Sequence, residues 1–176
     1  MHRRLRIFLV TIISILFLSN LSISATRERI RIDEFFLRTH LTELKNPRLM
    51  IATDIKDKDE REGYRDLGYS FIIEGDFNKD GYTDFAIVGK YDGPFPNKSF
   101  FVAVLSVRGA KVSVDFLRKI TGHDRAFLCL EPGHRVHVEN IDQRFDVIVV
   151  AMELWTDYAW AIAWDGKKYI ETECEY

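Results

Sequence analysis

The sequence has no apolar run long enough to cross a membrane. Its apolar segment at 7–18 spans twelve residues, whereas a membrane-spanning helix needs about 20. No cysteine stands near the end of this segment, which excludes a lipoprotein anchor. We therefore expect no stable membrane insertion.

The N-terminal segment instead has the pattern of a secretory signal peptide. Basic residues at 2–6 precede the apolar segment, and small residues at 22–25 offer a cleavage site. We predict a signal peptide at 1–25 and a single mature domain at 26–176, exported to the periplasm or the exterior. An uncleaved membrane anchor is the alternative.

The predicted mature chain also lacks a surplus of basic residues. It keeps 22 of the 25 Lys and Arg residues, because three arginines lie in segment 1–25, and all 27 Asp and Glu residues. A nucleic-acid-binding protein needs a basic patch. We therefore expect no nucleic-acid partner.

Cysteine occurs only twice, at Cys129 and Cys174. An even count in an oxidising compartment allows one disulfide, which would close a long loop and stabilise the fold. Cys129, however, lies in the apolar run Phe127–Leu130, where a buried thiol is common. Both alternatives stay open, because spacing alone does not decide disulfide geometry.

Familiar catalytic motifs are absent: the sequence has no Gly-x-Ser-x-Gly, no His-Glu-x-x-His and no phosphate-binding glycine loop. A looser group of titratable residues could supply a general base or a metal ligand, and its members are His123, Asp124, Glu131, His134 and His137. On a predicted strand, the last two histidines would point to opposite faces. This geometry disfavours a metal site shared by the two histidines. A secreted hydrolase-like enzyme that uses the cluster stays the alternative function.

Periodicity predicts one helix followed by strands. Asp33 is a suitable helix cap, and apolar residues recur on one face until Asn46-Pro47 ends the pattern. Strand-like segments follow, at 69–74, 83–90, 99–107, 111–120, 126–131, 135–138, 146–152, 158–164 and 168–173. Glycine-containing turns join several of them so closely that these strands must be antiparallel. We predict an α+β fold, with the N-terminal amphipathic helix packed on an antiparallel β-sheet.

The connection between the first two predicted strands carries oxygen-bearing side chains at alternate positions. Calcium takes about six to eight oxygen ligands, and a curled loop can turn such side chains to one centre. Gly81 permits the sharp turn, and a backbone carbonyl after it would supply a further oxygen. The pattern predicts a calcium site in a β-hairpin, with the ligands Asp76, Asn78, Asp80, Tyr82 (by its carbonyl) and Asp84.

An EF-hand loop begins in the same way, but it requires flanking helices and a glutamate at its twelfth position, which is Ile87 here. An acid at the ninth position, between strands, instead resembles the calcium loops of FG-GAP and VCBS-type repeats, the family that includes integrin propeller loops. Gly75-Asp76-Phe77-Asn78, Asp80-Gly81 and Asp84 carry the match, which implies calcium coordination by the five ligands above. The motif has no second copy, and the chain is short for a complete propeller. Only the ion site is therefore inferred from the resemblance.

Two alternatives to calcium stay open. The loop could be an ion-free acidic turn whose side chains bond their own backbone, or it could hold another metal, although an all-oxygen ligand set suits calcium better than zinc or copper. With calcium as its structural cofactor, we predict an exported, non-catalytic module for which binding or adhesion is a candidate role. Its protein or glycan partner is unidentified. The residues that form either core packing or an aromatic contact surface are Trp155, Tyr158, Trp160, Trp164 and Tyr169.

Overall fold

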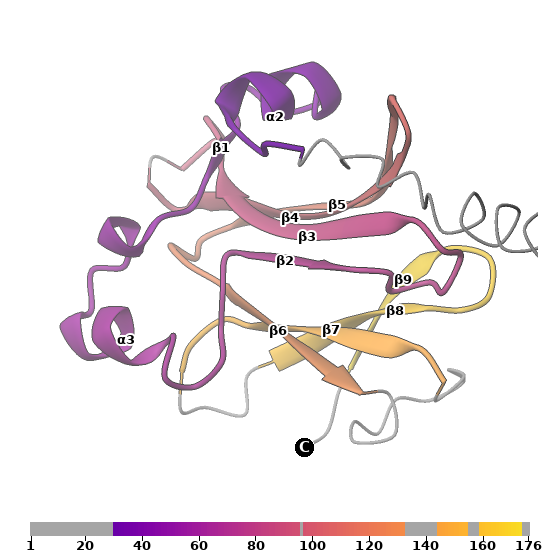
Figure 1. Ribbon diagram of the computed structural model, residues 1–176. Helices are drawn as coiled ribbons and strands as arrows, with labels where there is room; N and C mark the ends of the chain where they lie inside the picture. Colours follow the sequence, from indigo (N-terminus) through magenta and orange to yellow (C-terminus); the bar gives the residue numbers. More distant parts are fainter. Residues whose placement is uncertain (1–29, 96, 133–143, 155–158, 174–176) are drawn as a thin grey trace, which may run out of the picture. The chain divides into compact units, whose positions relative to one another are not determined.

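The computed structural model describes residues 30–95, 97–132, 144–154 and 159–173. The chain divides into two units, Met1–Arg31 and Ile32–Tyr176, and the elements below belong to the second. Strands dominate this unit and form two antiparallel sheets (Figure 1). Within the described ranges, no helix is long and apolar enough to cross a membrane.

The first sheet has two long strands at its centre. β3 (Thr83–Lys90) pairs with β4 (Ser99–Arg108), and β4 pairs with β5 (Lys111–Thr121). The other edge of β3 is shared by two short strands, β1 (Arg48–Leu49) and β2 (Ile72–Gly75). The β2–β3 pair is the hairpin that carries the predicted calcium loop.

The second sheet has the order β6-β7-β8-β9. Its strands are β6 (Phe127–Pro132), β7 (Asp146–Ala151), β8 (Ala159–Trp164) and β9 (Tyr169–Glu173). Ser70 and Leu128 exchange two backbone hydrogen bonds of 2.8 Å, which join the segment leading into β2 to β6. The two sheets are therefore linked through the backbone as well as through their side chains.

One apolar core cluster contains residues of both sheets. The first sheet contributes Ala86, Val88, Phe100, Val102 and Val104, and the second contributes Phe127, Leu128, Ile148, Val150 and Ile162. The intervening residues of the central strands are buried as well, among them Ile87, Ala103 and Val149. β3, β4 and β7 are therefore buried on both faces along most of their length.

Strand positions and turns agree closely with the sequence pattern. β2 to β9 fall on the predicted segments, and segment 135–138 lies outside the described residues. Arg108 pairs with Lys111, so Gly109, at φ 64°, and Ala110 form the predicted tight turn. Gly166, at φ 95°, has the same role between β8 and β9. Turn chemistry therefore located these hairpins correctly.

The predicted α+β class is wrong. The fold is mostly β, and the layer that packs against the first sheet is the second sheet. The N-terminal helix α2 (Glu34–His40) has only seven residues, and Leu37 is its single buried side chain. A helix with one buried residue does not supply the amphipathic layer that the prediction required.

The helix pattern failed at its C-terminal half. Asp33 caps α2 as predicted, because its carboxylate accepts the Phe36 amide at 3.0 Å. The chain leaves the helix after His40, so the buried Leu41 and Leu44 belong to an irregular segment. Apolar spacing alone does not distinguish a helix from a folded-over loop that buries the same side chains.

Candidate metal centre

The predicted calcium loop connects the end of β2 to the start of β3, where Gly75 pairs with Asp84. Two residues inside the loop are in the left-handed region, Lys79 at φ 57° and Gly81 at φ 85°. Positive φ angles curl the chain tightly, and glycine adopts them without steric cost. The backbone is therefore bent as an ion-binding loop requires.

Phe77 anchors the loop in the core. Its side chain is 1% exposed, and a Cβ atom at position 75 would lie 2.5 Å from its Cε1 atom. Glycine is needed at position 75 because a side chain there would collide with the ring. The anchored ring fixes the loop, while Asp76 is only partly buried and Asp80 is exposed.

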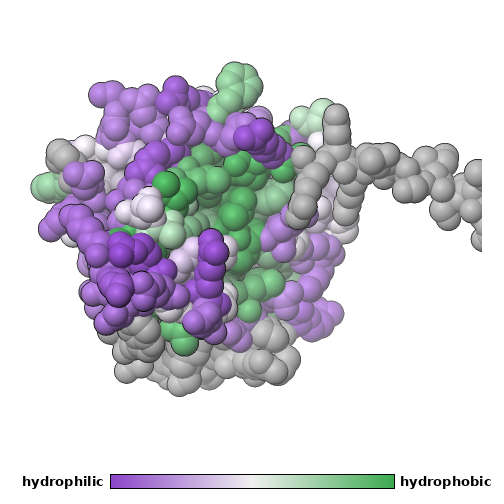
Figure 2. Space-filling model, turned by 60° about the vertical axis from the view of Figure 1, so that its left-hand side comes forward, coloured by the Kyte–Doolittle hydropathy of each residue, from purple (hydrophilic) through white to green (hydrophobic). Residues whose placement is uncertain are grey.

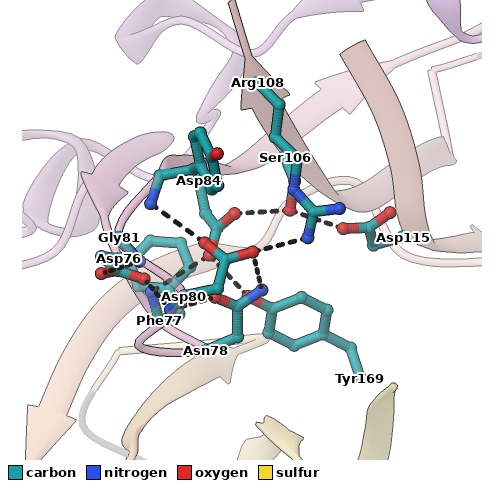
Figure 3. A network of polar contacts seen from close by, with 11 residues as sticks. Asp76, Phe77, Asn78, Asp80, Gly81, Asp84, Ser106, Arg108, Asp115 and Tyr169 are labelled. Carbon is teal, nitrogen blue, oxygen red and sulfur yellow. Dashed lines mark hydrogen bonds and ion pairs between the residues drawn. The ribbon is translucent and has the colours of Figure 1, made fainter. Parts of the chain in front are cut away.

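Three of the predicted ligands gather around one backbone amide (Figure 3). The Asp80 amide donates to Asp76 Oδ1 at 2.9 Å and to Asn78 Oδ1 at 3.0 Å. The Gly81 amide donates to Asp76 Oδ2 at 2.9 Å. Each of these oxygens has a second lone pair, so Asp76 and Asn78 keep acceptor sites for a cation.

Asp84 lies deeper, with 0% of its surface exposed. Its Oδ1 atom accepts the Ser106 hydroxyl at 2.5 Å, and its Oδ2 atom accepts the Tyr169 hydroxyl at 2.7 Å and the Phe77 amide at 3.1 Å. A carboxylate has about four lone-pair sites, so three donors leave about one. Asp84 could therefore join a calcium shell through one oxygen.

The network continues from Ser106 to Asp115 on β5 (Figure 3). The Ser106 hydroxyl is 2.5 Å from both Asp84 Oδ1 and Asp115 Oδ2, yet it has a single hydrogen to donate. Ser106 can therefore donate to only one of these two carboxylates at a time. A β-bulge brings Asp115 to this position, because the β4–β5 register shifts between Val104 and Leu105 and leaves Asp115 as the extra residue.

Two cationic side chains bind the loop to its surroundings. The Arg108 Nη2 atom lies 2.5 Å from Asp80 Oδ2, and the Lys79 Nζ atom lies 2.7 Å from an oxygen of Asp146 on β7. Partial burial opposes ionisation of Asp80, but the Tyr82 amide and the Arg108 guanidinium outweigh it, so the pKa of Asp80 is lowered. The loop is thereby tied to both sheets.

In the buried part of the site, the charged forms of Asp84 and Tyr169 are less favourable than in water. Burial raises the pKa of the Asp84 carboxyl, although its three hydrogen-bond donors favour the charged form. Burial, followed by the hydrogen bond to Asp84, raises the pKa of Tyr169, and the charges of Asp115 and Asp80 add to this effect. The buried, poorly hydrated carboxylate is therefore that of Asp84, and Asp76, Asp80 and Asp115 lie around it with more contact to solvent.

The arrangement fits a calcium ion in part. Asp76, Asn78 and Asp80 lie together, Asp84 can add one oxygen, and the Tyr82 side chain is 47% exposed, as expected for a residue that would contribute only its carbonyl. Across the described residues, no three His, Cys, Asp or Glu side chains are grouped so as to hold a metal ion. An ion in this loop would therefore depend on the Asn78 amide and on backbone oxygen as well as on carboxylates.

Sequence reasoning missed part of this network: Ser106, Arg108, Asp115 and the contact of Tyr169 with Asp84. The sequence marks Tyr169 only as one of the aromatic residues of the C-terminal hairpin. The β-bulge that presents Asp115 leaves no mark in the alternation of β5, because it shifts the register by one residue within a strand that is only partly buried. A hydroxyl residue on a buried strand was the one available signal for Ser106.

The candidate catalytic cluster is described only in part. Asp124 accepts the Arg125 guanidinium at 2.8 Å, and Arg125 also pairs with Glu60 of α3 (Lys58–Gly63), so Asp124 belongs to an ion-pair network. His123 is exposed, and Glu131 is partly buried on β6. Two members lie outside the described residues, His134 and His137.

The aromatic residues of the C-terminal hairpin mainly pack. Trp160 has its ring centroid 6.3 Å from that of Phe116, and the Arg118 guanidinium lies 4.6 Å from the Trp160 ring. Trp164 contacts Tyr169 with centroids 5.0 Å apart. Both tryptophans are partly buried against the core. Three residues of the earlier predictions lie outside the described residues, namely Trp155, Tyr158 and Cys174, so the disulfide with the buried Cys129 stays a prediction.

Exposed apolar side chains occur on another side of the molecule, around the segment that follows β1. Ile51 is 54% exposed and Leu67 is 46% exposed. A pocket of about 500 Å³ lies between these segments, and Tyr64, Tyr69 and Phe71 are among its lining residues. Figure 2, which turns the left-hand side of Figure 1 forward, shows hydrophobic residues gathered in the middle of a face with hydrophilic residues around them.

No protein-family model, no curated protein and no solved structure matches this chain. The resemblance to FG-GAP and VCBS-type calcium loops therefore rests on the loop residues alone.

Proposed function

We propose that this protein is an exported, non-catalytic module whose Asp76–Asp84 loop binds calcium as a structural ion. One observation carries the proposal: two pairs of carboxylates lie in neighbouring hydrogen-bonded networks, close enough for their charges to act on one another, and one guanidinium contacts them in the described residues. They are Asp76, Asp80, Asp84 and Asp115, and the guanidinium is that of Arg108. A divalent cation would offset this surplus of negative charge.

The chemistry of the donor set supports calcium over zinc or copper. The available atoms are carboxylate, amide and carbonyl oxygens, which calcium prefers, whereas zinc and copper favour nitrogen and sulfur ligands. Asp76 is already oriented by the amides of Asp80 and Gly81. An ion would therefore meet an arranged ligand and need not order the whole loop.

A structural role follows from the position of the loop between the sheets. Tyr169 of β9 contacts Asp84, and Asp146 of β7 contacts Lys79. An ion that holds the loop would strengthen both links and so stabilise the packing of the two sheets. Weak sites are filled outside the cell, where calcium-binding modules have dissociation constants of about 10⁻⁴ to 10⁻³ M. Export, with binding or adhesion to an unidentified protein or glycan, completes the proposal.

The test is calorimetric titration of calcium into chelator-treated protein. We expect one site in the wild type and loss of binding in Asp76→Asn, which removes one charge from the ligand set. The matched control is Glu74→Gln. Glu74 is an exposed acid of β2, two residues before Asp76, and its side chain bonds no part of the loop in the described contacts. Equal binding by Asp76→Asn and wild type would overturn the proposal, as would the absence of binding to the wild type.

A further inference from the structure

A second polar site lies at the β1 end of the first sheet, apart from the calcium loop. It is a pocket of about 400 Å³ between the segment before β1 and the β3–β4 connection. Its lining residues are Lys45, Asn46, Arg48, Lys90, Tyr91, Asp92, Gly93, Asn97 and Ser99. This volume is within the range of about 300 to 1,000 Å³ that is usual for small-molecule sites.

The two walls of this pocket are bonded to each other. The Asp92 amide donates to the Lys45 carbonyl at 2.8 Å, and the Asn46 Nδ2 atom donates to Asp92 Oδ2 at 2.7 Å. The Tyr91 amide donates to the Ser99 carbonyl at 3.4 Å across the mouth of the connection. The pocket is therefore formed by the fold and does not depend on a ligand to assemble it.

Positive charge exceeds negative charge along the lining. Arg48 is satisfied by Asp54 in a bidentate ion pair with distances of 2.6 and 2.7 Å. Lys45 and Lys90 have no carboxylate within 4.0 Å among the described residues. Asp92 is the one acid of the lining, and one of its oxygens is already taken by Asn46.

Lys90 is partly buried, and its ammonium group has few hydrogen-bond partners among the described residues. Its Nζ atom donates a long hydrogen bond of 3.4 Å to the Asn97 carbonyl, although an ammonium group can donate three. Burial lowers the pKa of Lys90; Asp54 and Asp124 oppose this effect, whereas Arg48 adds to it. An anion beside the ammonium group would supply a further acceptor and favour its charged form.

We propose that this pocket binds a small molecule through an oxyanion group, a carboxylate or a phosphate, which Lys90 and Lys45 contact. Lysine ammonium groups bind such oxygens as point charges. The inference does not rest on the calcium site, because the two sites share no residue.

Thermal unfolding of the full chain, expressed with its own N-terminal segment and purified in the form that accumulates, tests this proposal. The first probe is inorganic phosphate, compared with chloride at equal ionic strength. Glucose 6-phosphate and glucuronate then separate phosphate from carboxylate ligands, with glucose as the uncharged control. We expect a saturable rise of the midpoint, since free ligand at ten times its dissociation constant raises the folded-to-unfolded ratio about 11-fold.

Matched lysine variants locate the effect. Lys90→Met should weaken anion binding about tenfold or more, because a charged hydrogen bond is lost, and Lys45→Met should weaken it as well. Lys98→Met is the control, since Lys98 is an exposed lysine of the same connection that does not line the pocket. A shift that equals that of chloride, fails to saturate, or persists unchanged in both pocket variants would overturn the proposal.

Discussion

The Tyr169 hydroxyl on β9 donates to Asp84 on β3 at 2.7 Å, so a carboxylate of one sheet is bonded to a phenol of the other. Both residues are buried, and both have raised pKa values because their charged forms are poorly hydrated. The contact connects the predicted ion loop to the packing of the two sheets. Its removal should therefore affect stability and, if the loop binds calcium, the ion site as well.

Tyr169→Phe removes only the hydroxyl that Asp84 accepts. We expect a loss of about 1 to 2 kcal/mol in the free energy of unfolding, because a buried carboxylate loses a donor. Urea denaturation measures the change. Tyr82→Phe is the control, since Tyr82 is 47% exposed and should be nearly neutral; equal losses in the two variants would argue against a special role of the Asp84 contact.

Gly75→Ala tests the anchoring of the loop by Phe77. The new Cβ atom would lie 2.5 Å from the buried ring, so the ring or the backbone must move. Overpacking of this kind costs about 1 to 3 kcal/mol. A double variant with Phe77→Leu should be less destabilised than the sum of the single changes; strict additivity would show that the two residues do not collide.

Arg108→Gln tests whether the guanidinium competes with an ion for Asp80. Arg108 lies 2.5 Å from Asp80 Oδ2 and is the cation nearest to the loop carboxylates in the described contacts. Its removal should tighten calcium binding several-fold, because a positive charge beside the ion is lost. Calorimetric titration of the variant measures this, and weaker binding than in the wild type would mean that Arg108 supports the site.

Asp54→Asn should destabilise the protein at neutral pH by about 1 kcal/mol, allowing for screening at a partly exposed pair. Burial opposes ionisation of Asp54, but hydrogen bonds from Arg48 and the Ile51 amide outweigh it and lower its pKa below 3.8. The ionised form is therefore favoured in the folded state, and its contribution is present above that pH.

The same contribution disappears as the pH falls below 3.8 and through the folded-state pKa of Asp54. Urea denaturation across this range should show wild type and Asp54→Asn converging in acid. Asp66→Asn, which changes an exposed acid, should show no such convergence. A constant difference between wild type and Asp54→Asn at every pH would contradict the predicted linkage.

The strands could be predicted because two local signals agree along this chain. Runs such as Phe100–Leu105 are apolar at every position, and glycine marks the turns at Gly109 and Gly166. The number of sheets could not be predicted. A hairpin turn shows that two consecutive strands pair, but it does not show where one sheet ends and the next begins. The helix was overestimated because Leu41 and Leu44 are buried for tertiary reasons after α2 has ended.

The candidate site was predictable only where its residues are close in sequence. Asp76, Asn78 and Asp80 form a local pattern, and their shared amide contacts follow from a short curled loop. Ser106 and Asp115 reach the same network from two other strands, and the second does so through a β-bulge. Such contacts depend on strand register, which alternation alone does not specify to one residue.

Calcium-dependent thermal unfolding tests the central claim most directly. Wild type, Asp80→Ala and the control Glu74→Gln are each unfolded in chelator and in millimolar calcium. A bound ion raises the midpoint by mass action, so wild type and Glu74→Gln should gain stability in calcium while Asp80→Ala loses most of the shift. An equal midpoint for wild type in chelator and in calcium would contradict the account and leave the loop as an ion-free acidic turn.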